Sequence, residues 1–189
     1  MLPIIMSAIE SPADCDLMTD FYLANNALMY HEARKYIDIT EDVEDIVYEA
    51  LAKIIDKMDV FRDLKSWQQR QYAVTTVRNL AYIFLKRKNH FEFVSLDGID
   101  FDVLSYADID TELEAEKKIM LSEIRQIWNS LELEDKVLLE QKYVLKWKDQ
   151  EIAEPLNIQP QSIRMRLTRA KRNLVLELQK KGITFEDWS

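Results

Sequence analysis

The sequence has few of the residues that build disulfide-linked, metal-bound or loop-rich proteins. Its 189 residues include one cysteine, two histidines, two glycines and four prolines. The single Cys15 excludes an internal disulfide framework and a cysteine-based metal site. His31 and His90 lie far apart and have no ligand spacing to a partner, so we expect no metal and no other cofactor. A glycine-rich phosphate loop and a nucleophile–base arrangement are also absent. We therefore assign no catalytic residue and do not expect an enzyme.

Long apolar runs are also missing. No run reaches 18 apolar residues, so the sequence does not predict a membrane-spanning helix. The first 16 residues contain no basic side chain and only a short apolar core, unlike a signal peptide. We therefore expect a cytoplasmic protein. With 48% hydrophobic residues and so little glycine and proline, the composition indicates a folded, helix-rich chain.

The net charge of −9 hides two basic segments in an acidic chain. Arg62–His90 holds seven Lys or Arg and one acid, and Lys142–Lys181 holds ten against four. Two separate basic segments are expected of a protein that contacts nucleic-acid phosphates at two places. The alternative is a pair of helices whose basic sides are only solvated.

The second basic segment contains a pattern typical of a helix-turn-helix motif, over Asp149–Leu174. Asp149 suits the N-cap of the first helix. Asn157 suits a left-handed backbone where the chain reverses, and Pro160 suits the first position of the second helix. Pro155 departs from the motif, because it should bend or end the first helix.

The predicted second helix has one apolar and one polar side. Its apolar side holds Ile163, Leu167, Ala170, Leu174 and Leu178. Its other side holds the candidate DNA contacts Gln161, Met165, Thr168, Arg169 and Arg172. A helix with such a polar side can lie in a major groove. This stretch alone leaves open an amphipathic helical hairpin whose charged side is merely solvated.

The segment Leu17–His90 has an almost unbroken helical pattern, interrupted near Asp38–Thr40 and Arg62–Ser66. Thr40 is predicted to cap a helix with acids in its first turn. The predicted buried side of this helix consists of Val43, Ile46, Val47, Ala50, Ile54 and Met58. The opposite side carries Glu41, Asp45, Glu49 and Asp56. Such an acidic side is either a solvated face or a docking surface for a basic partner.

Ser66 is predicted to begin the next helix, with Gln69 completing a capping box. The predicted outer side of this helix consists of Tyr72, Thr75, Asn79, Tyr82 and Lys86. Exposed tyrosines among amide and basic side chains suit single-stranded DNA, because rings stack on unpaired bases while cations meet phosphates. Packing against the preceding helix is the alternative for Tyr72 and Tyr82.

Between the two helical segments, Phe91–Asp110 holds five aspartates and shows no helical period, which indicates a linker. The predicted fold is therefore all-α, with two small helical domains joined by an acidic linker. The first domain is predicted at residues 17–90, the linker at 91–116 and the second domain at 117–181.

With these segments, the chain resembles the bacterial sigma-70 family of RNA polymerase initiation factors, and most of all their short extracytoplasmic-function (ECF) type. The resemblance rests on three segments, similar in type and order to parts of regions 2 and 4 of that family. They are DVEDIVYEALAKI (Asp42–Ile54), RQYAVTTVRNLAYIFLKRKN (Arg70–Asn89) and EIAEPLNIQPQSIRMRLTRAKRNL (Glu151–Leu174). The family implies a factor that binds core RNA polymerase, directs it to promoter DNA and assists promoter melting. An anti-sigma factor is a further partner that the resemblance leaves open.

The resemblance also implies three sets of site residues. Core polymerase would be bound by Asp42, Glu44, Asp45 and Glu49. The minus-ten promoter element would be bound by Arg78, Asn79, Tyr82, Lys86 and Arg87. The minus-thirty-five element would be read by Arg164, Met165, Thr168 and Arg169, with Arg166, Lys171 and Arg172 near phosphates. The linker aspartates would lie in the channel that RNA later occupies.

The chain departs from the family pattern at several positions. Pro155 and Asn157 replace a helix former and a glycine of the helix-turn-helix, and Tyr48 stands where glutamine is usual. Met165 is apolar at a base-facing position, which favours a thymine methyl over a hydrogen-bonded base. The main alternative function is a helix-turn-helix regulator that binds DNA without polymerase. A third is an interaction protein that sequesters partners through its acidic helix, which leaves the basic segments unexplained.

Overall fold

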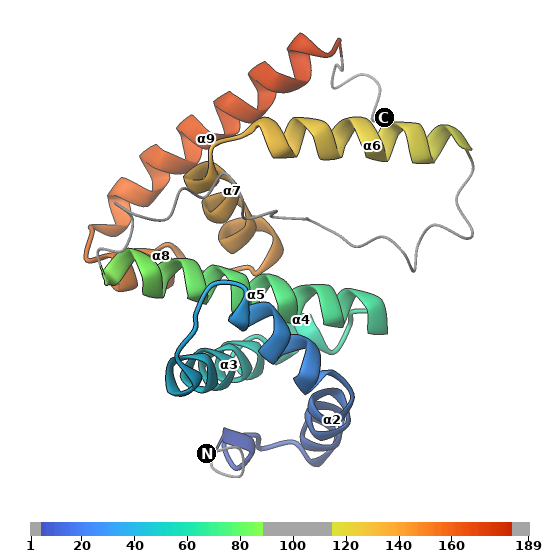
Figure 1. Ribbon diagram of the computed structural model, residues 1–189, viewed down its shortest axis with the longest axis vertical. Helices are drawn as coiled ribbons and strands as arrows, with labels where there is room; N and C mark the ends of the chain where they lie inside the picture. The colour runs from blue at the N-terminus through green and yellow to red at the C-terminus, as the bar shows by residue number, and fades with distance from the viewer. Residues whose placement is uncertain (1–4, 89–114, 183–189) are drawn as a thin grey trace. The chain divides into compact units, whose positions relative to one another are not determined.

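The computed structural model describes residues 5–88 and 115–182, and every element in these ranges is helical (Figure 1). This confirms the predicted all-α class. The chain divides into two compact units, Met1–Ile99 and Asp100–Ser189. The predicted acidic linker, residues 91–116, lies outside the described residues except for its last two, which begin a helix.

The first unit is built from α2 (Pro12–Arg34), α3 (Thr40–Ile55), α4 (Met58–Phe61) and α5 (Ser66–Arg87). The helices α2, α3 and α5 all pack against one another. Ser11 caps α2 by accepting a hydrogen bond from the Asp14 N–H at 3.4 Å. The two predicted interruptions are confirmed, and a further break separates α3 from α4.

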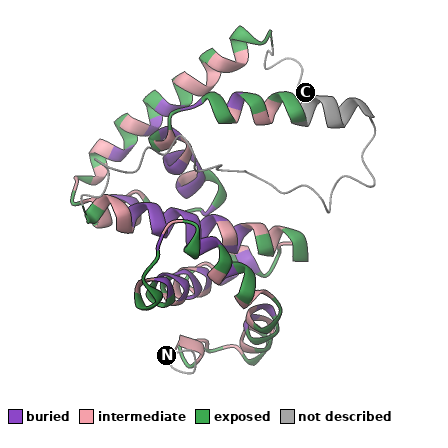
Figure 2. Ribbon diagram, in the orientation of Figure 1, coloured by how far each residue is buried: buried purple, intermediate pink, exposed green. Residues whose placement is uncertain are grey.

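The helix α3 turns its apolar side inward, as predicted (Figure 2). All six predicted positions are buried, but Val43, Ile46, Val47, Ala50 and Ile54 lie in α3, whereas Met58, expected on the same helix, begins α4. The predicted cap at Thr40 is wrong, because Thr40 is the first helical residue and Ile39 stands at the N-cap without a side-chain bond. Ile39 is extended, at φ −78° and ψ 121°, and Thr40 is already helical, so the helix begins one residue earlier than a Thr40 cap requires.

Three aromatic rings pack together in the core of the first unit. Phe61, the last residue of α4, is fully buried. Its ring meets Phe21 of α2 at 5.0 Å and Tyr72 of α5 at 5.8 Å, both edge-on. Such contacts add to the free energy gained by burying the rings. Tyr72 is therefore a core residue, and its expected place on an exposed side of α5 is wrong.

The start of α5 differs by one residue from the predicted capping box. Lys65 stands at the N-cap, and its backbone N–H donates to Gln68 Oε1 at 2.9 Å. Ser66 is thus inside the helix. Gln69, expected to complete the box, donates instead to the Phe61 carbonyl at 3.1 Å. This bond ties the start of α5 to the end of α4.

The second unit packs its last, long helix against three earlier ones. Its elements are α6 (Ala115–Ser130), α7 (Leu133–Leu139), η4 (Glu140–Val144), α8 (Asp149–Ala153), η5 (Glu154–Leu156) and α9 (Pro160–Lys180). The helix α9 contacts α6, α7 and α8. Trp147, Ile152 and Ile163 are among the largest side chains that are fully or almost fully buried in this unit.

The turn between α8 and α9 follows the local predictions. The helix α8 ends at Ala153, and Pro155 lies in the 3₁₀ turn η5 that follows. Asn157 is left-handed, at φ 53° and ψ 43°, where the chain reverses. Pro160 is the first residue of α9, where a proline costs no hydrogen bond.

Candidate functional site

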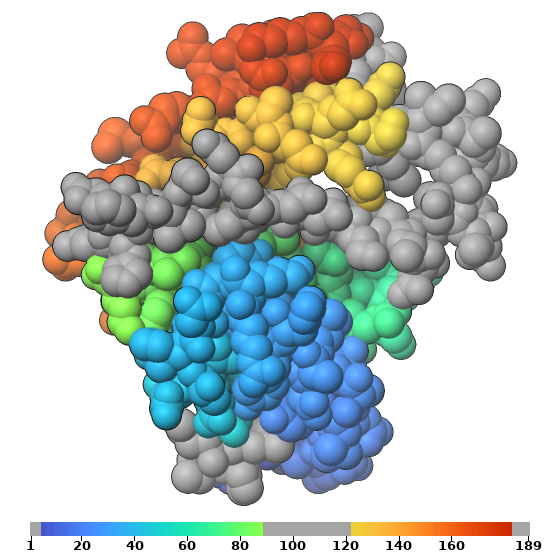
Figure 3. All heavy atoms as spheres, in the orientation of Figure 1, coloured from blue at the N-terminus to red at the C-terminus, as the bar shows by residue number. Residues whose placement is uncertain are grey.

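The outer side of α9 is a continuous exposed surface of polar and basic side chains. Exposed positions on it are Gln161, Arg164, Met165, Thr168, Arg169, Lys171 and Arg172, while Arg166 is half-buried. Met165 is the most exposed large apolar side chain among the described residues. On the face shown in Figure 3, α9 reaches the surface along much of its length. The predicted separation of the two sides of this helix is confirmed.

The inner side of α9 holds this surface in place. Ile163, Leu167 and Ala170 are buried, and Leu174 packs against the cluster that contains Ala170. A side-chain hydrogen bond of 2.6 Å from Asn173 Nδ2 to Asp135 Oδ2 joins α9 to α7. With one side anchored in a core, the exposed residues project from a rigid element, as recognition by a helix requires.

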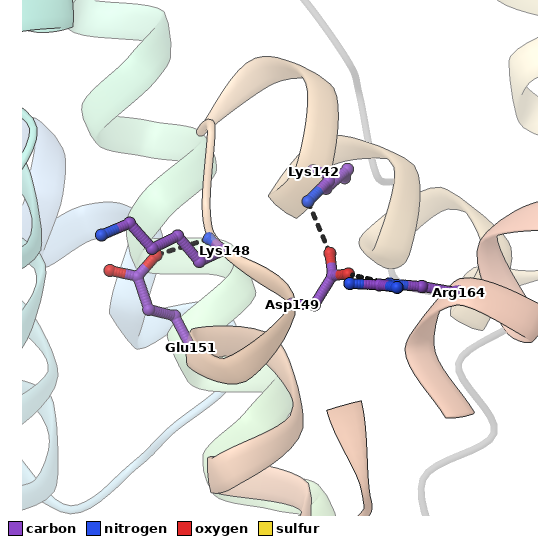
Figure 4. A network of polar contacts seen from close by, with 5 residues as sticks. All are labelled: Lys142, Lys148, Asp149, Glu151 and Arg164. Carbon is purple, nitrogen blue, oxygen red and sulfur yellow. Dashed lines mark hydrogen bonds and ion pairs between the residues drawn. The ribbon is translucent and has the colours of Figure 1, made fainter. Parts of the chain in front are cut away.

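Asp149 lies between two cations, in a network shown in Figure 4. Its Oδ1 accepts from Lys142 Nζ at 2.5 Å, and its Oδ2 accepts from Arg164 Nε at 3.0 Å. The hydrogen bond from Lys142, and next the one from Arg164, lowers the pKa of Asp149. The carboxylate is therefore charged at neutral pH.

The expected N-cap role of Asp149 is wrong. Lys148 is the N-cap of α8, and its backbone N–H donates to Glu151 Oε2 at 2.5 Å. The Glu151 carboxylate thus accepts a hydrogen bond from a backbone N–H at the N-terminal end of α8. Asp149 instead contacts the side chains of Lys142 in η4 and Arg164 in α9. Sequence reasoning missed this network because Asp149 and Arg164 are 15 residues apart across a turn.

Two further residues on α9 have defined local partners. The Thr168 hydroxyl donates to the Arg164 carbonyl at 2.9 Å, within the helix. The Lys171 ammonium lies 4.8 Å from the centre of the exposed Tyr143 ring, a cation–π arrangement. The sequence pattern does not point to Tyr143, because this residue falls in the irregular helical turn η4, which has no clear period.

The middle of α5 is far more buried than predicted. Arg78, Asn79 and Tyr82 are 2%, 0% and 6% exposed, so the expected place of Asn79 and Tyr82 on an exposed outer side is wrong. The Asn79 amide donates to the Thr75 carbonyl at 2.8 Å. The exposure of a helix depends on everything that covers it, and the sequence pattern of one helix does not contain that information. DNA contact by these three side chains requires that they be uncovered.

The end of α5 is more accessible. Lys86 is half-buried and Arg87 is exposed. The Lys86 ammonium donates to the Tyr82 hydroxyl at 3.3 Å and lies 5.5 Å from the centre of its ring. A cation and an aromatic ring thus occupy neighbouring positions, a combination that suits a single nucleic-acid strand once the buried Tyr82 ring is uncovered.

The acidic side of α3 is exposed at Glu41, Glu44, Asp45 and Glu49. Asp42 is half-buried, and its carboxylate pairs with Lys88 Nζ at 2.9 Å. We therefore separate Asp42, which links α3 to the end of α5, from the exposed residues Glu44, Asp45 and Glu49, called the acidic face below. The acidic face has no described ion-pair partner in the protein, so its charge is open to another molecule.

Tyr48 directly precedes Glu49 of the acidic face in α3, and it is half-buried and hydrogen-bonded to Tyr30 of α2. Burial, and then hydrogen bonds with Tyr48 and Tyr22, hold the pKa of Tyr30 above its ordinary value. The Tyr30 hydroxyl of α2 is therefore protonated at neutral pH, and its hydrogen bond with Tyr48 links α2 to α3. Tyr48 thus has a structural role next to the acidic face, which its position in the sequence did not reveal.

Residues 21–91 match the family model described as Sigma-70 region 2. The matched segment begins within α2 and includes α3, α4 and α5. It contains the acidic face and all predicted minus-ten residues, and it supports a factor of the sigma-70 family. No curated protein matches the chain.

Neither a membrane-spanning helix nor a metal-binding group of side chains is found in the part of the chain that the structure describes. None of its helices is long and apolar enough to cross a membrane. Within residues 5–88 and 115–182, no three His, Cys, Asp or Glu side chains are grouped so as to hold a metal ion.

Proposed function

We propose that this chain is a sigma-70-type transcription initiation factor, similar to the ECF group, that binds core RNA polymerase in the cytoplasm and directs it to promoters. The observation that carries the proposal is the match of residues 21–91 to Sigma-70 region 2. A protein with this function binds polymerase through one surface and promoter DNA through others. Candidates for each surface lie on α3, α5 and α9.

The acidic face is the proposed polymerase contact. Glu44, Asp45 and Glu49 are exposed on one side of a helix whose other side is buried in the core. Phosphates would repel these carboxylates, so the surface suits a basic protein partner better than DNA. Asp42 would take part only by exchanging its internal partner, Lys88, for one on the polymerase.

The proposed DNA contacts lie on α9 and α5. The exposed side of α9 would read the minus-thirty-five element in the major groove, because it offers Gln, Thr and Arg on a rigid helix. Lys86 and Arg87 of α5 would meet backbone phosphates of the minus-ten element. Arg78, Asn79 and Tyr82 would act after being uncovered during promoter binding, when strands separate.

A second function, a DNA-binding regulator that acts without polymerase, is favoured by one observation. The match to Sigma-70 region 2 ends at residue 91, while the exposed basic side of α9 lies in the second unit. A regulator would need only α9 and its supporting helices, and the acidic face would be a solvated surface.

Gel filtration of the full chain with purified core RNA polymerase separates these two functions. An initiation factor should elute with core as a stable complex in the absence of DNA. A regulator should elute at its own volume and bind duplex DNA with or without core. Elution of the chain apart from core at micromolar concentrations of both would contradict the proposed function.

A further inference from the structure

The two oxygens of Asp149 bind side chains from two different elements. Lys142 comes from η4 and Arg164 from α9, and both bonds end on a carboxylate in α8 (Figure 4). The Asp149 side chain is only 17% exposed, whereas the Arg164 side chain is 79% exposed. Asp149 therefore belongs to the frame of the second unit, while Arg164 projects from it toward solvent.

We propose that Asp149 is a positioning residue that fixes the direction of the Arg164 guanidinium for base recognition. This inference rests on the proposed function, since it assumes that the outer side of α9 contacts promoter DNA. Asp149 itself would not touch a base. It would act through Arg164, and its effect should appear as sequence preference.

The geometry of the Asp149–Arg164 bond leaves the recognition atoms of Arg164 available. Asp149 binds Nε, and no hydrogen bond from either Nη group of Arg164 is formed to another described residue. An arginine recognises guanine through two parallel N–H donors that meet O6 and N7. Because the guanidinium is planar, a bond at Nε also sets the plane in which the Nη donors lie.

An exposed arginine whose conformation is already fixed in the free protein loses less side-chain entropy when it binds DNA. A free arginine side chain loses rotamer entropy when it is fixed against a base, and this loss reduces affinity. Here the order is imposed within the protein by the 3.0 Å bond to Asp149. The Arg164 side chain therefore reaches the DNA in a restricted set of conformations. A base pair that does not fit these conformations is bound only weakly.

Lys142 makes this arrangement stable. Asp149 would otherwise be free to rotate toward solvent together with Arg164. The 2.5 Å bond from Lys142 holds the second carboxylate oxygen, so the carboxylate has little freedom to turn. The exposed residues Arg169 and Arg172 have no carboxylate partner among the described side chains, which sets Arg164 apart from its neighbours on α9.

The test uses the full chain bound to core polymerase and a random-sequence duplex library. Bound duplexes are selected and sequenced for the parent protein, Arg164→Ala and Asp149→Asn. Arg164→Ala should remove the preference at one base pair. Asp149→Asn should weaken the preference at that same base pair about tenfold, within the range expected for one bidentate contact, and should leave other positions unchanged.

Two comparisons separate positioning from general effects. Asp149→Asn removes one negative charge, so its affinity for random duplex should stay the same or rise. Glu177→Gln is the matched control, because it removes the same charge from an ion pair at the other end of α9, with Lys180. This control should keep the full sequence preference. In the Arg164→Ala background, Asp149→Asn should cause no further loss of preference.

Full preference of Asp149→Asn at the position that depends on Arg164 would overturn the inference. Equal losses on selected and random duplex would also overturn it, because they would show that Asp149 only stabilises the fold. If the parent protein selects no sequence when bound to core, the proposed function itself fails, and this outcome is distinct from the other two.

Discussion

At the scale of single residues, the turn between η5 and α9 depends on the backbone of Asn157. Its φ of 53° lies in the left-handed region, which costs most residues roughly 1–2 kcal/mol. Asparagine tolerates this region better than most residues other than glycine. The side chain is exposed, so the backbone conformation and not packing should govern a substitution here.

We expect Asn157→Ala to lower the free energy of unfolding of the second unit by about 1 kcal/mol. Asn157→Gly should leave it nearly unchanged, because glycine adopts a positive φ without strain but gains entropy in the unfolded chain. Chemical denaturation of the full chain measures both, with the exposed Glu154→Ala as a control in the same turn. If alanine and glycine have the same effect, Asn157 is not strained.

Tyr82 is buried in the free protein, and its proposed role is to stack on an unpaired base. Tyr82→Leu keeps an apolar side chain in this place but removes the ring. Since stacking is worth about 1–3 kcal/mol per base, it should reduce permanganate-reactive open complex roughly tenfold. Tyr82→Phe, which keeps the ring, is the control and should open promoters normally.

A premelted bubble template should restore much of the transcription lost in Tyr82→Leu, because the bases are then already unpaired. Both variants should bind duplex promoter almost as well as the parent protein. If Tyr82→Leu opens promoters as well as the parent, Tyr82 serves only to pack α5.

At the scale of elements, α3 presents its acidic face on a helix that is firmly packed on its other side. Asp45→Lys combined with Glu49→Lys should abolish co-elution with core polymerase while leaving the circular dichroism spectrum unchanged. The matched control is Asp16→Lys with Asp20→Lys, which makes the same charge change at exposed positions of α2. Loss of core binding in both double variants would indicate a general effect of charge and not a contact by the acidic face.

The exposed side of α9 should contain residues of two kinds. Arg169→Ala should cost about 1–3 kcal/mol on selected duplex and less on random duplex, if Arg169 contacts a base. Lys171→Ala should weaken binding about equally on both and reduce the salt slope by roughly one unit. Fluorescence anisotropy over a range of salt concentrations measures these effects. Identical behaviour of the two variants would remove the distinction between base and phosphate contacts.

The sequence predicted α3 and α9 well because each has one apolar side against a core and one polar side in solvent. The period of such a helix predicts both sides, with Ile163 inside and Met165 outside. The helical period did not predict which side of α5 is exposed, because polar residues such as Asn79 are buried as well. It also missed the bond between Asp149 and Arg164, because the geometry of a turn that includes Asn157 decides which side chains meet.

At the scale of the whole molecule, the distribution of charge matters more than its sum. The net charge of −9 keeps most of the surface unfavourable for DNA, while the basic segments Arg62–His90 and Lys142–Lys181 are each strongly positive. One segment includes α5 and the other includes α9, so each unit contributes its own basic helix. Such a chain should bind DNA at defined places and avoid it elsewhere.

Run-off transcription with purified core polymerase on fragments of the host genome measures directly whether this chain initiates transcription. Reactions contain core alone, core with the parent chain, or core with the Asp45→Lys, Glu49→Lys double variant. We expect transcripts with defined 5′ ends only when the parent chain is present. If the parent chain adds no defined transcript to those made by core alone, it is not an initiation factor.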